Sequence, residues 1–287
     1  MNTSNFAMAA QLAPGSRFRA FLAPGPALAG LLLIAIVVAA IAPQLFSHLN
    51  PLAIAPREAF RAPGWAHFFG TDQSGRDIFT RVIYGTRQSL LLGVGAVVLS
   101  MVVAVILGLL GGLTGRLGER AVGWILDVLF SFPTMILALL FGAHLGNGII
   151  PLIIATGIGN APGYARMVFG QVLTARNAGY IEAARALGHS PLRTIRRQIL
   201  PNAMRPLIVT ITMGVGQAIV WASALSFLGL GAKPPAAEWG TMLSMGRDFV
   251  QQAWWLTFFP GLFIVLTTLS TTILGRYLQR RLEGRVS

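Results

Sequence analysis

Long apolar runs dominate this chain, and short polar segments separate them. A hydrocarbon core about 30 Å thick is spanned by roughly 20 apolar residues of α-helix. Six runs reach that length, over residues 26–46, 89–113, 121–143, 147–166, 206–229 and 255–275. The pattern predicts an all-α polytopic membrane protein with six transmembrane helices within residues 26–275. Residues 1–25 and 276–287 are then the N-terminal and C-terminal tails, which are expected on the cytoplasmic side.

The composition supports a membrane protein. The chain is 54% hydrophobic and 11% charged, whereas soluble domains carry about 25% charged residues. It contains no cysteine, which excludes disulfides, thiolate chemistry and cysteine-based metal sites.

The net charge of +13 is unevenly distributed over the predicted topology. If both termini lie in the cytoplasm, that side carries 15 of the 22 basic residues and the other side carries 7. Such an excess follows the positive-inside rule. The charge therefore indicates an orientation, and nucleic-acid binding is not needed to explain it.

Asp127 is the one ionisable residue that falls clearly within a predicted span. An intramembrane acid is a candidate functional site. The alternative is a carboxylate bonded to a neighbouring helix or to Arg120. The scarcity of other charges in the spans argues against a proton-driven carrier.

Glycine and proline mark helix contacts and irregular helices. Glycines four apart allow close helix packing, and they occur at Gly108/Gly112, Gly111/Gly115 and Gly142/Gly146. The fourth span is expected to be broken or bent, because it contains Pro151, Gly159, Pro162 and Gly163.

The polar segment 167–205 between the fourth and fifth spans predicts two short helices joined by a turn. The first covers about 180–187 and ends at Gly188, a residue suited to the left-handed position after a helix. Ser190 is expected to cap the second helix, with Pro191 at its first position. Pro201 is expected to stop or kink that helix.

Two interpretations of this segment follow from its residues. The small side chains of Ala183, Ala184 and Ala186 would give the first helix a slim surface that fits a groove on a partner. Alternatively, the segment is an amphipathic loop on anionic lipid, with Glu182 paired to Arg185 on one helix face.

The spacing of Glu182-Ala183-Ala184, Gly188 and Leu200-Pro201 resembles the EAA loop of ABC importer permeases. Residues 69–90, 226–235 and 238–240 resemble segments of the dipeptide/oligopeptide/nickel group of that family. The chain departs from the pattern at Gln198, where many members have Ile, and in its basic C-terminal segment.

This resemblance implies a type I ABC importer permease fold and a role as a transport subunit in a bacterial plasma (inner) membrane, with no cofactor or metal. A homologous second permease, two ABC ATPase subunits and a periplasmic or lipid-anchored substrate-binding protein would be its partners. The imported substrate would be a dipeptide or oligopeptide, or alternatively glutathione, an opine, or a nickel or other metal chelate. The ATPase-coupling residues it implies are Glu182, Ala183, Ala184, Ala186, Leu187, Gly188, His189, Ser190, Leu200 and Pro201.

The segments on the other side of the membrane predict structural roles. Ser74 and Asp77 fit a capping box that opens a helix over 75–84. Trp239, Trp254 and Trp255 fit an interfacial aromatic belt.

Several other functions find little support in the residues. A P-loop needs Gly-Lys-Ser/Thr, and the only lysine is Lys233, which is followed by proline. The four histidines (His48, His67, His144, His189) show no ligand spacing. An ATP-independent secondary carrier remains a less favoured alternative, and an intramembrane enzyme would need a catalytic partner for Asp127.

Overall fold

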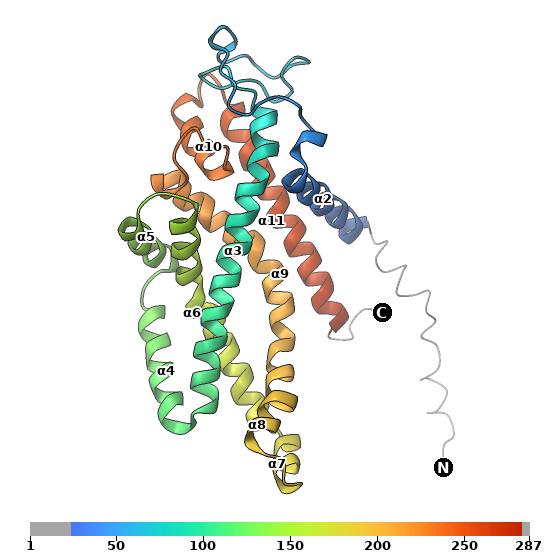
Figure 1. Ribbon diagram of the computed structural model, residues 1–287, viewed down its shortest axis with the longest axis vertical. Helices are drawn as coiled ribbons and strands as arrows, with labels where there is room; N and C mark the ends of the chain where they lie inside the picture. The colour runs from blue at the N-terminus through green and yellow to red at the C-terminus, as the bar shows by residue number, and fades with distance from the viewer. Residues whose placement is uncertain (1–23, 283–287) are drawn as a thin grey trace, which may run out of the picture.

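The computed structural model describes residues 24–282, and this part of the chain is helical, without β-strands. The α-helices are α2 (Pro24–Ile41), α3 (Ile78–Leu113), α4 (Gly115–Phe130), α5 (Thr134–Leu145), α6 (Ile149–Arg176), α7 (Gly179–Ala186), α8 (Pro191–Thr194), α9 (Leu200–Leu225), α10 (Trp239–Gly246) and α11 (Trp255–Leu282). The long helices α3, α6, α9 and α11 form an elongated bundle (Figure 1). Residues 42–77 and α10 lie at one end, called the cap end here. The helices α7 and α8 project at the other, the elbow end.

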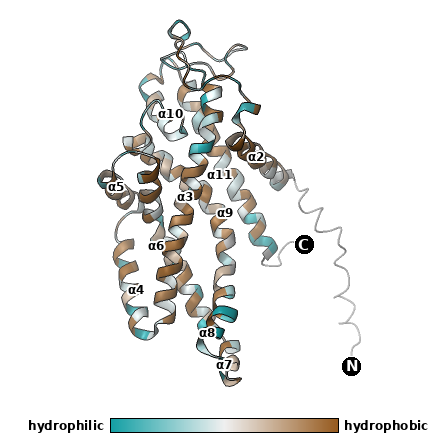
Figure 2. Cartoon of the chain, viewed as in Figure 1, coloured by the Kyte–Doolittle hydropathy of each residue, from teal (hydrophilic) through white to brown (hydrophobic). Residues whose placement is uncertain are grey.

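Each of the six predicted spans corresponds to a helix or a helix pair. Among the described residues, three helices are long and apolar enough to cross a membrane, or four if the bent pair α4 and α5 is one span. The first span, α2, is a shorter apolar helix, and the fourth corresponds to α6. Apolar residues cover most of the bundle between its two ends (Figure 2).

The third span is not the single helix expected over 121–143. The helices α4 and α5 meet at a bend of 86°, and the break falls at residues 131–133. Pro133 has no N–H to donate, and its ring disfavours helical geometry at Phe132. These two effects disfavour a helix across residues 131–133, and α4 ends at Phe130, two residues before Phe132.

The fourth span is longer than expected and is not broken at its prolines. The helix α6 runs through 28 residues with Pro162 inside it. Pro151 is the third residue of α6, where an N–H would have no partner within the helix. Of the two expected outcomes, a break or a bend, the break is therefore absent, and α6 continues ten residues beyond the expected end of the span.

The expected capping box at Ser74 and Asp77 is also wrong. The helix begins at Ile78, and Asp77 itself is the N-cap, with its Oδ1 accepting from the backbone N–H of Thr80 at 2.7 Å. An Asp in the cap position satisfies a free N–H of the first turn. The second span therefore starts eleven residues earlier than predicted, within a 36-residue helix.

Glycines bring α3 against α6, as the four-residue spacing predicted. A Cβ on Gly108 would lie 2.4 Å from Cγ1 of Val168, and one on Gly112 would lie 2.3 Å from Cγ1 of Val172. These distances leave no room for a side chain, so the two helix backbones approach closely at both positions. Gly146 instead caps the end of α5 with a positive φ.

Two of the three tryptophans expected in an interfacial belt are core residues. The indole N–H of Trp239 donates to the carbonyl of Val82 at 2.9 Å, and that of Trp255 donates to the carbonyl of Thr71 at 3.0 Å. Both side chains are buried, whereas Trp254 is exposed. The belt prediction is wrong for Trp239 and Trp255, because buried carbonyls within the protein satisfy their polar atoms.

Candidate functional site

The elbow, residues 179–199, contains the two short helices that the sequence predicted. The turn after α7 has Gly188 at φ +76°. The N–H of Gly188 donates to the carbonyl of Arg185 at 2.9 Å, and that of His189 donates to the carbonyl of Ala184 at 3.1 Å. This pair of bonds is a Schellman motif, with glycine in the left-handed position.

The second helix of the elbow begins as predicted. The hydroxyl of Ser190 accepts from the backbone N–H of Arg193, and Pro191 occupies the first helical position. The geometry of the whole turn is thus determined by three adjacent local signals, namely a left-handed glycine, a capping serine and a helix-starting proline.

Pro201 does not stop this helix, which was one of the two predicted outcomes, a stop or a kink. A π-helical turn over Ile195–Ile199 follows α8, and α9 then starts at Leu200. The N–H of Leu200 donates to the carbonyl of Ile195, five residues earlier. The wider turn accommodates Pro201, which cannot donate and would crowd the carbonyl of Arg197 in a regular helix. A continuous helical segment therefore runs from Pro191 to Leu225.

The elbow is anchored to the bundle on one face. Ile181 and Ile199 are buried in the same apolar cluster as Val168 and Val172 of α6. The sequence predicted a slim exposed surface formed by Ala183, Ala184 and Ala186. Ala184 is buried, so only Ala183 and Ala186 contribute to that surface. The elbow is therefore packed against α6 and α9 through this cluster.

The opposite face of the elbow carries unpaired and apolar side chains. Leu187 is 77% exposed and Leu192 is 67% exposed. Glu182 is exposed, and within the described residues it makes no ion pair, so the expected pairing with Arg185 is absent. Two exposed leucines beside an unpaired carboxylate make this face a candidate interaction surface for a protein or a membrane.

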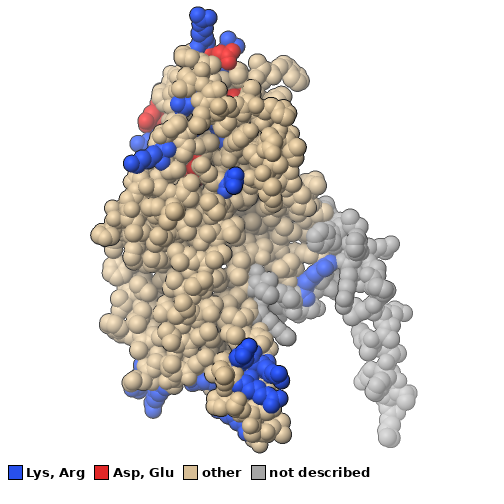
Figure 3. All heavy atoms as spheres, viewed as in Figure 1, with Lys and Arg blue, Asp and Glu red and all other residues tan. Residues whose placement is uncertain are grey.

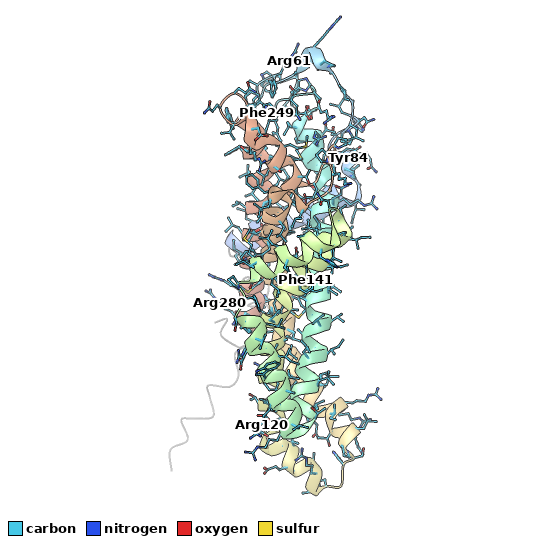
Figure 4. All side chains as sticks on the ribbon, turned by 90° about the vertical axis from the view of Figure 1, so that its left-hand side faces the viewer. Arg61, Tyr84, Arg120, Phe141, Phe249 and Arg280 are labelled. Atoms are coloured by element: carbon cyan, nitrogen blue, oxygen red, sulfur yellow. The ribbon has the colours of Figure 1, made fainter. Side chains whose placement is uncertain are left out.

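Basic residues surround this face. Arg185, Arg193, Arg196 and Arg197 are all exposed. Figure 3 shows a cluster of Lys and Arg at the elbow end and most of the visible Asp and Glu at the cap end. In Figure 4, Arg120 at the start of α4 lies near the elbow, and Arg61 lies at the far end of the molecule.

Asp127 has a partner that the sequence analysis did not identify. Nη2 of Arg166 donates to Oδ1 of Asp127 at 2.8 Å. Asp127 is thus bonded to a neighbouring helix, as one interpretation held, and Arg120 is not its partner. Arg166 is the last residue of the predicted fourth span (147–166), but α6 continues ten residues beyond it.

A cavity lies beside this ion pair. It measures about 350 Å³ and is bounded by α6, α9 and the segment where α4 bends into α5. Its polar lining residues are Thr134, Asn160, Tyr164 and Thr210. Within the described residues, no cluster of His, Asp or Glu is suited to hold a metal ion.

This arrangement of helices is that of the membrane subunits of ABC importers. A methionine ABC transporter solved in inward-facing conformations matches with a TM-score of 0.58 and 21% identity, over 73% of this chain and 98% of that one. At this identity the match shows the fold, which is the type I importer permease fold expected from the sequence.

The chain belongs to the family of binding-protein-dependent transport system inner membrane components, which matches residues 78–284. The dipeptide transport system permease protein of Alkalihalophilus pseudofirmus is 40% identical over 262 residues, 91% of this chain and 86% of the relative. The glutathione transport system permease protein of Pectobacterium atrosepticum is 39% identical over 224 residues, 78% of this chain and 74% of the relative. The chain is therefore a membrane-embedded permease subunit of an ABC importer.

Proposed function

We propose that this permease imports small peptides and that partner ATPase subunits drive it by docking on the elbow. The observation that carries the proposal is the combination of an exposed face and a buried face on one rigid element. The exposed face presents Glu182, Leu187 and Leu192, while Ile181 and Ile199 fix the elbow in the core.

The helical path behind the elbow supports transmission of movement. Because α8, the π-helical turn and α9 form one continuous segment from Pro191 to Leu225, a displacement of the docked elbow moves α9 with it. The inner face of α9 lines the cavity through Thr210. ATP-driven closure of two ATPase subunits would thereby switch the spans between inward-facing and outward-facing states.

The implied assembly has four kinds of component. This chain pairs with a homologous second permease in a bacterial plasma (inner) membrane, with both termini in the cytoplasm. Two ABC ATPase subunits bind the elbow end, and a periplasmic or lipid-anchored substrate-binding protein delivers substrate to the cap end. Residues 167–205 act as the coupling segment within the permease domain 26–275.

Small peptides are the substrate class that the relatives favour. The names of two relatives, 40% and 39% identical, specify dipeptides and glutathione. Both are short peptides with free charged groups. Opines and metal chelates remain alternatives that a direct uptake assay distinguishes.

The experiment purifies the tagged chain from its native membrane in mild detergent, identifies co-purifying proteins and reconstitutes the complex for uptake of labelled dialanine. Two P-loop ATPases, a second permease and ATP-dependent uptake would support the proposal. A chain that purifies alone and transports without ATP would overturn it and favour a secondary carrier.

A matched pair of variants tests the elbow itself. Leu187→Ala, combined with Glu182→Ala, removes side chains from the proposed docking face and should lower ATP-driven uptake at least tenfold. Leu117→Ala is the control, because Leu117 is 83% exposed but lies in the first turn of α4, outside the elbow. Equal uptake by both variants would contradict docking at the elbow.

A further inference from the structure

The ion pair between Asp127 and Arg166 lies on an exposed face of the bundle, well away from the elbow ends of α4 and α6. From a rise of 1.5 Å per residue, Asp127 is about 18 Å along α4 from Gly115, and Arg166 is about 15 Å from the end of α6 at Arg176. The side chains of Asp127 and Arg166 are nevertheless 62% and 52% exposed in the chain. Figure 4 shows Phe141, on the helix that follows the bend, near the middle of the long axis.

A lipid-facing position is unfavourable for such a pair. Charged side chains at membrane depth face a protein interior or a water-filled cavity. The pair uses one nitrogen of Arg166 and one oxygen of Asp127, and the described residues offer neither group a second ionic partner. Arg166 therefore has N–H donors and Asp127 has an acceptor oxygen that are not used in the pair. Water or another molecule must bind these groups.

The cavity next to the pair has the lining of a ligand site. The ring of Phe130 lines it and also lies under the guanidinium of Arg166, 5.3 Å from ring centre to Cζ. Asn160 and Tyr164 contribute polar side chains to the cavity, and neither makes a hydrogen bond with any residue the structure describes. A mostly apolar cavity with a few unpartnered polar groups, within the usual range of about 300–1,000 Å³, is typical of small-molecule sites.

We infer that this cavity and its ion pair form a site that holds a small zwitterionic peptide during transport. Arg166 meets the peptide carboxylate, Asp127 meets the ammonium group, and Asn160 and Tyr164 offer hydrogen bonds to the peptide amide. A dipeptide extends about 7 Å, so binding opens the single 2.8 Å contact and replaces it with two charge-assisted ones. An exposed ion pair contributes little stability, which makes this exchange easy. The inference rests on the proposed function, because it assigns the peptide path to this face of the permease.

Two glycines of α6 allow a matched test in a chain that has no cysteine. A Cβ at Gly163, which lines the cavity, or at Gly170, which does not, would meet no atom within 4 Å. Gly163→Cys and Gly170→Cys are compared in the intact complex in lipid nanodiscs, with a cationic methanethiosulfonate reagent as the probe. Dialanine should slow modification of Gly163→Cys at least fivefold and leave Gly170→Cys unchanged. An unreactive Gly163→Cys, or the same effect of dialanine on both variants, would overturn the inference.

Recognition of the charged termini needs a second measurement. Asp127→Asn should reduce uptake of dialanine at least tenfold but change uptake of N-acetyl-dialanine less than twofold, and Asp127→Glu should restore dialanine uptake. Equal losses for both peptides would mean that Asp127 has a structural role only, and would overturn its assignment to the ammonium group.

The two proposals fail in different ways. If the wild-type complex shows no ATP-driven peptide uptake, the proposed function fails, and the labelling of Gly163→Cys still reports directly on peptide binding in the cavity. If the wild-type complex imports dialanine and Gly163→Cys shows no protection, only the inferred site is wrong.

Discussion

Gly108 on α3 lies directly against Val168 on α6, and a Cβ at position 108 would be 2.4 Å from Cγ1 of that valine. Real Cβ atoms do not approach a neighbour so closely, so any larger residue must push the two helices apart. The contact lies near the C-terminal end of α3, within its last two turns.

The first prediction concerns this contact. Gly108→Leu should lower the free energy of unfolding by at least the 1–3 kcal/mol typical of overpacking, seen as a lower melting temperature of the purified chain in detergent. Gly170→Leu is the control, because a Cβ there meets nothing within 4 Å. A similar melting temperature for the two variants would show that α3 and α6 separate without cost.

The second prediction concerns the buried indole of Trp239. Trp239→Phe removes the hydrogen bond to the carbonyl of Val82, which still accepts from the hydroxyl of Thr86. The expected cost is therefore the net value of one hydrogen bond, about 0.5–1.5 kcal/mol. Trp254→Phe alters an exposed ring and should change the melting temperature little. If both variants changed the melting temperature equally, the hydrogen bond of the Trp239 N–H would not contribute to stability.

The third prediction concerns the turn of the elbow. Gly188→Ala places a Cβ at φ +76°, where L-residues are disfavoured by roughly 1–2 kcal/mol, and should displace α8 relative to α7. The ratio of peptide imported to ATP hydrolysed is expected to fall several-fold in the reconstituted complex. Gly179→Ala lacks this strain and should retain the wild-type ratio; a normal ratio for Gly188→Ala would argue against a precise elbow geometry.

The fourth prediction concerns the start of α10. The carboxylate of Glu238 is buried and accepts from the backbone N–H groups of Gly240 at 2.7 Å and Thr241 at 2.8 Å. Glu238→Ala leaves both donors unpaired and should destabilise the cap end by more than the roughly 1 kcal/mol of an exposed N-cap. Asp248→Ala, on an exposed side chain of the same end, is the comparison, and hydrogen exchange of the α10 amides is the measurement.

The sequence predicted what neighbouring residues determine. The elbow turn depends on Gly188, Ser190 and Pro191, which are close in sequence and act through local geometry. Each of the six apolar runs likewise coincides with a helix or a helix pair, and three or four of these are long and apolar enough to cross a membrane within the described residues. The helix continues through Pro201 because a π-helical turn accommodates the proline, and no single residue encodes that turn.

Features that depend on distant residues were not predictable in this way. Asp127 and Arg166 are 39 positions apart, and their pairing depends on how α4 packs beside α6. Trp239 could lie in an interfacial belt or in the core, since both environments suit an amphipathic ring. Only the position of the Val82 carbonyl, 157 residues away, decides between them.

The continuous segment from Pro191 to Leu225 has a consequence for the evolution of the chain. At its cap end, α10 packs so closely on it that a Cβ on Gly240 would lie 2.7 Å from Cα of Ser223. Inserting or deleting one residue in α9 would rotate its two ends relative to each other by about 100°. The elbow would then face a different direction whenever the cap remained in place. Among related proteins, this segment should therefore vary more by substitution than by insertion or deletion.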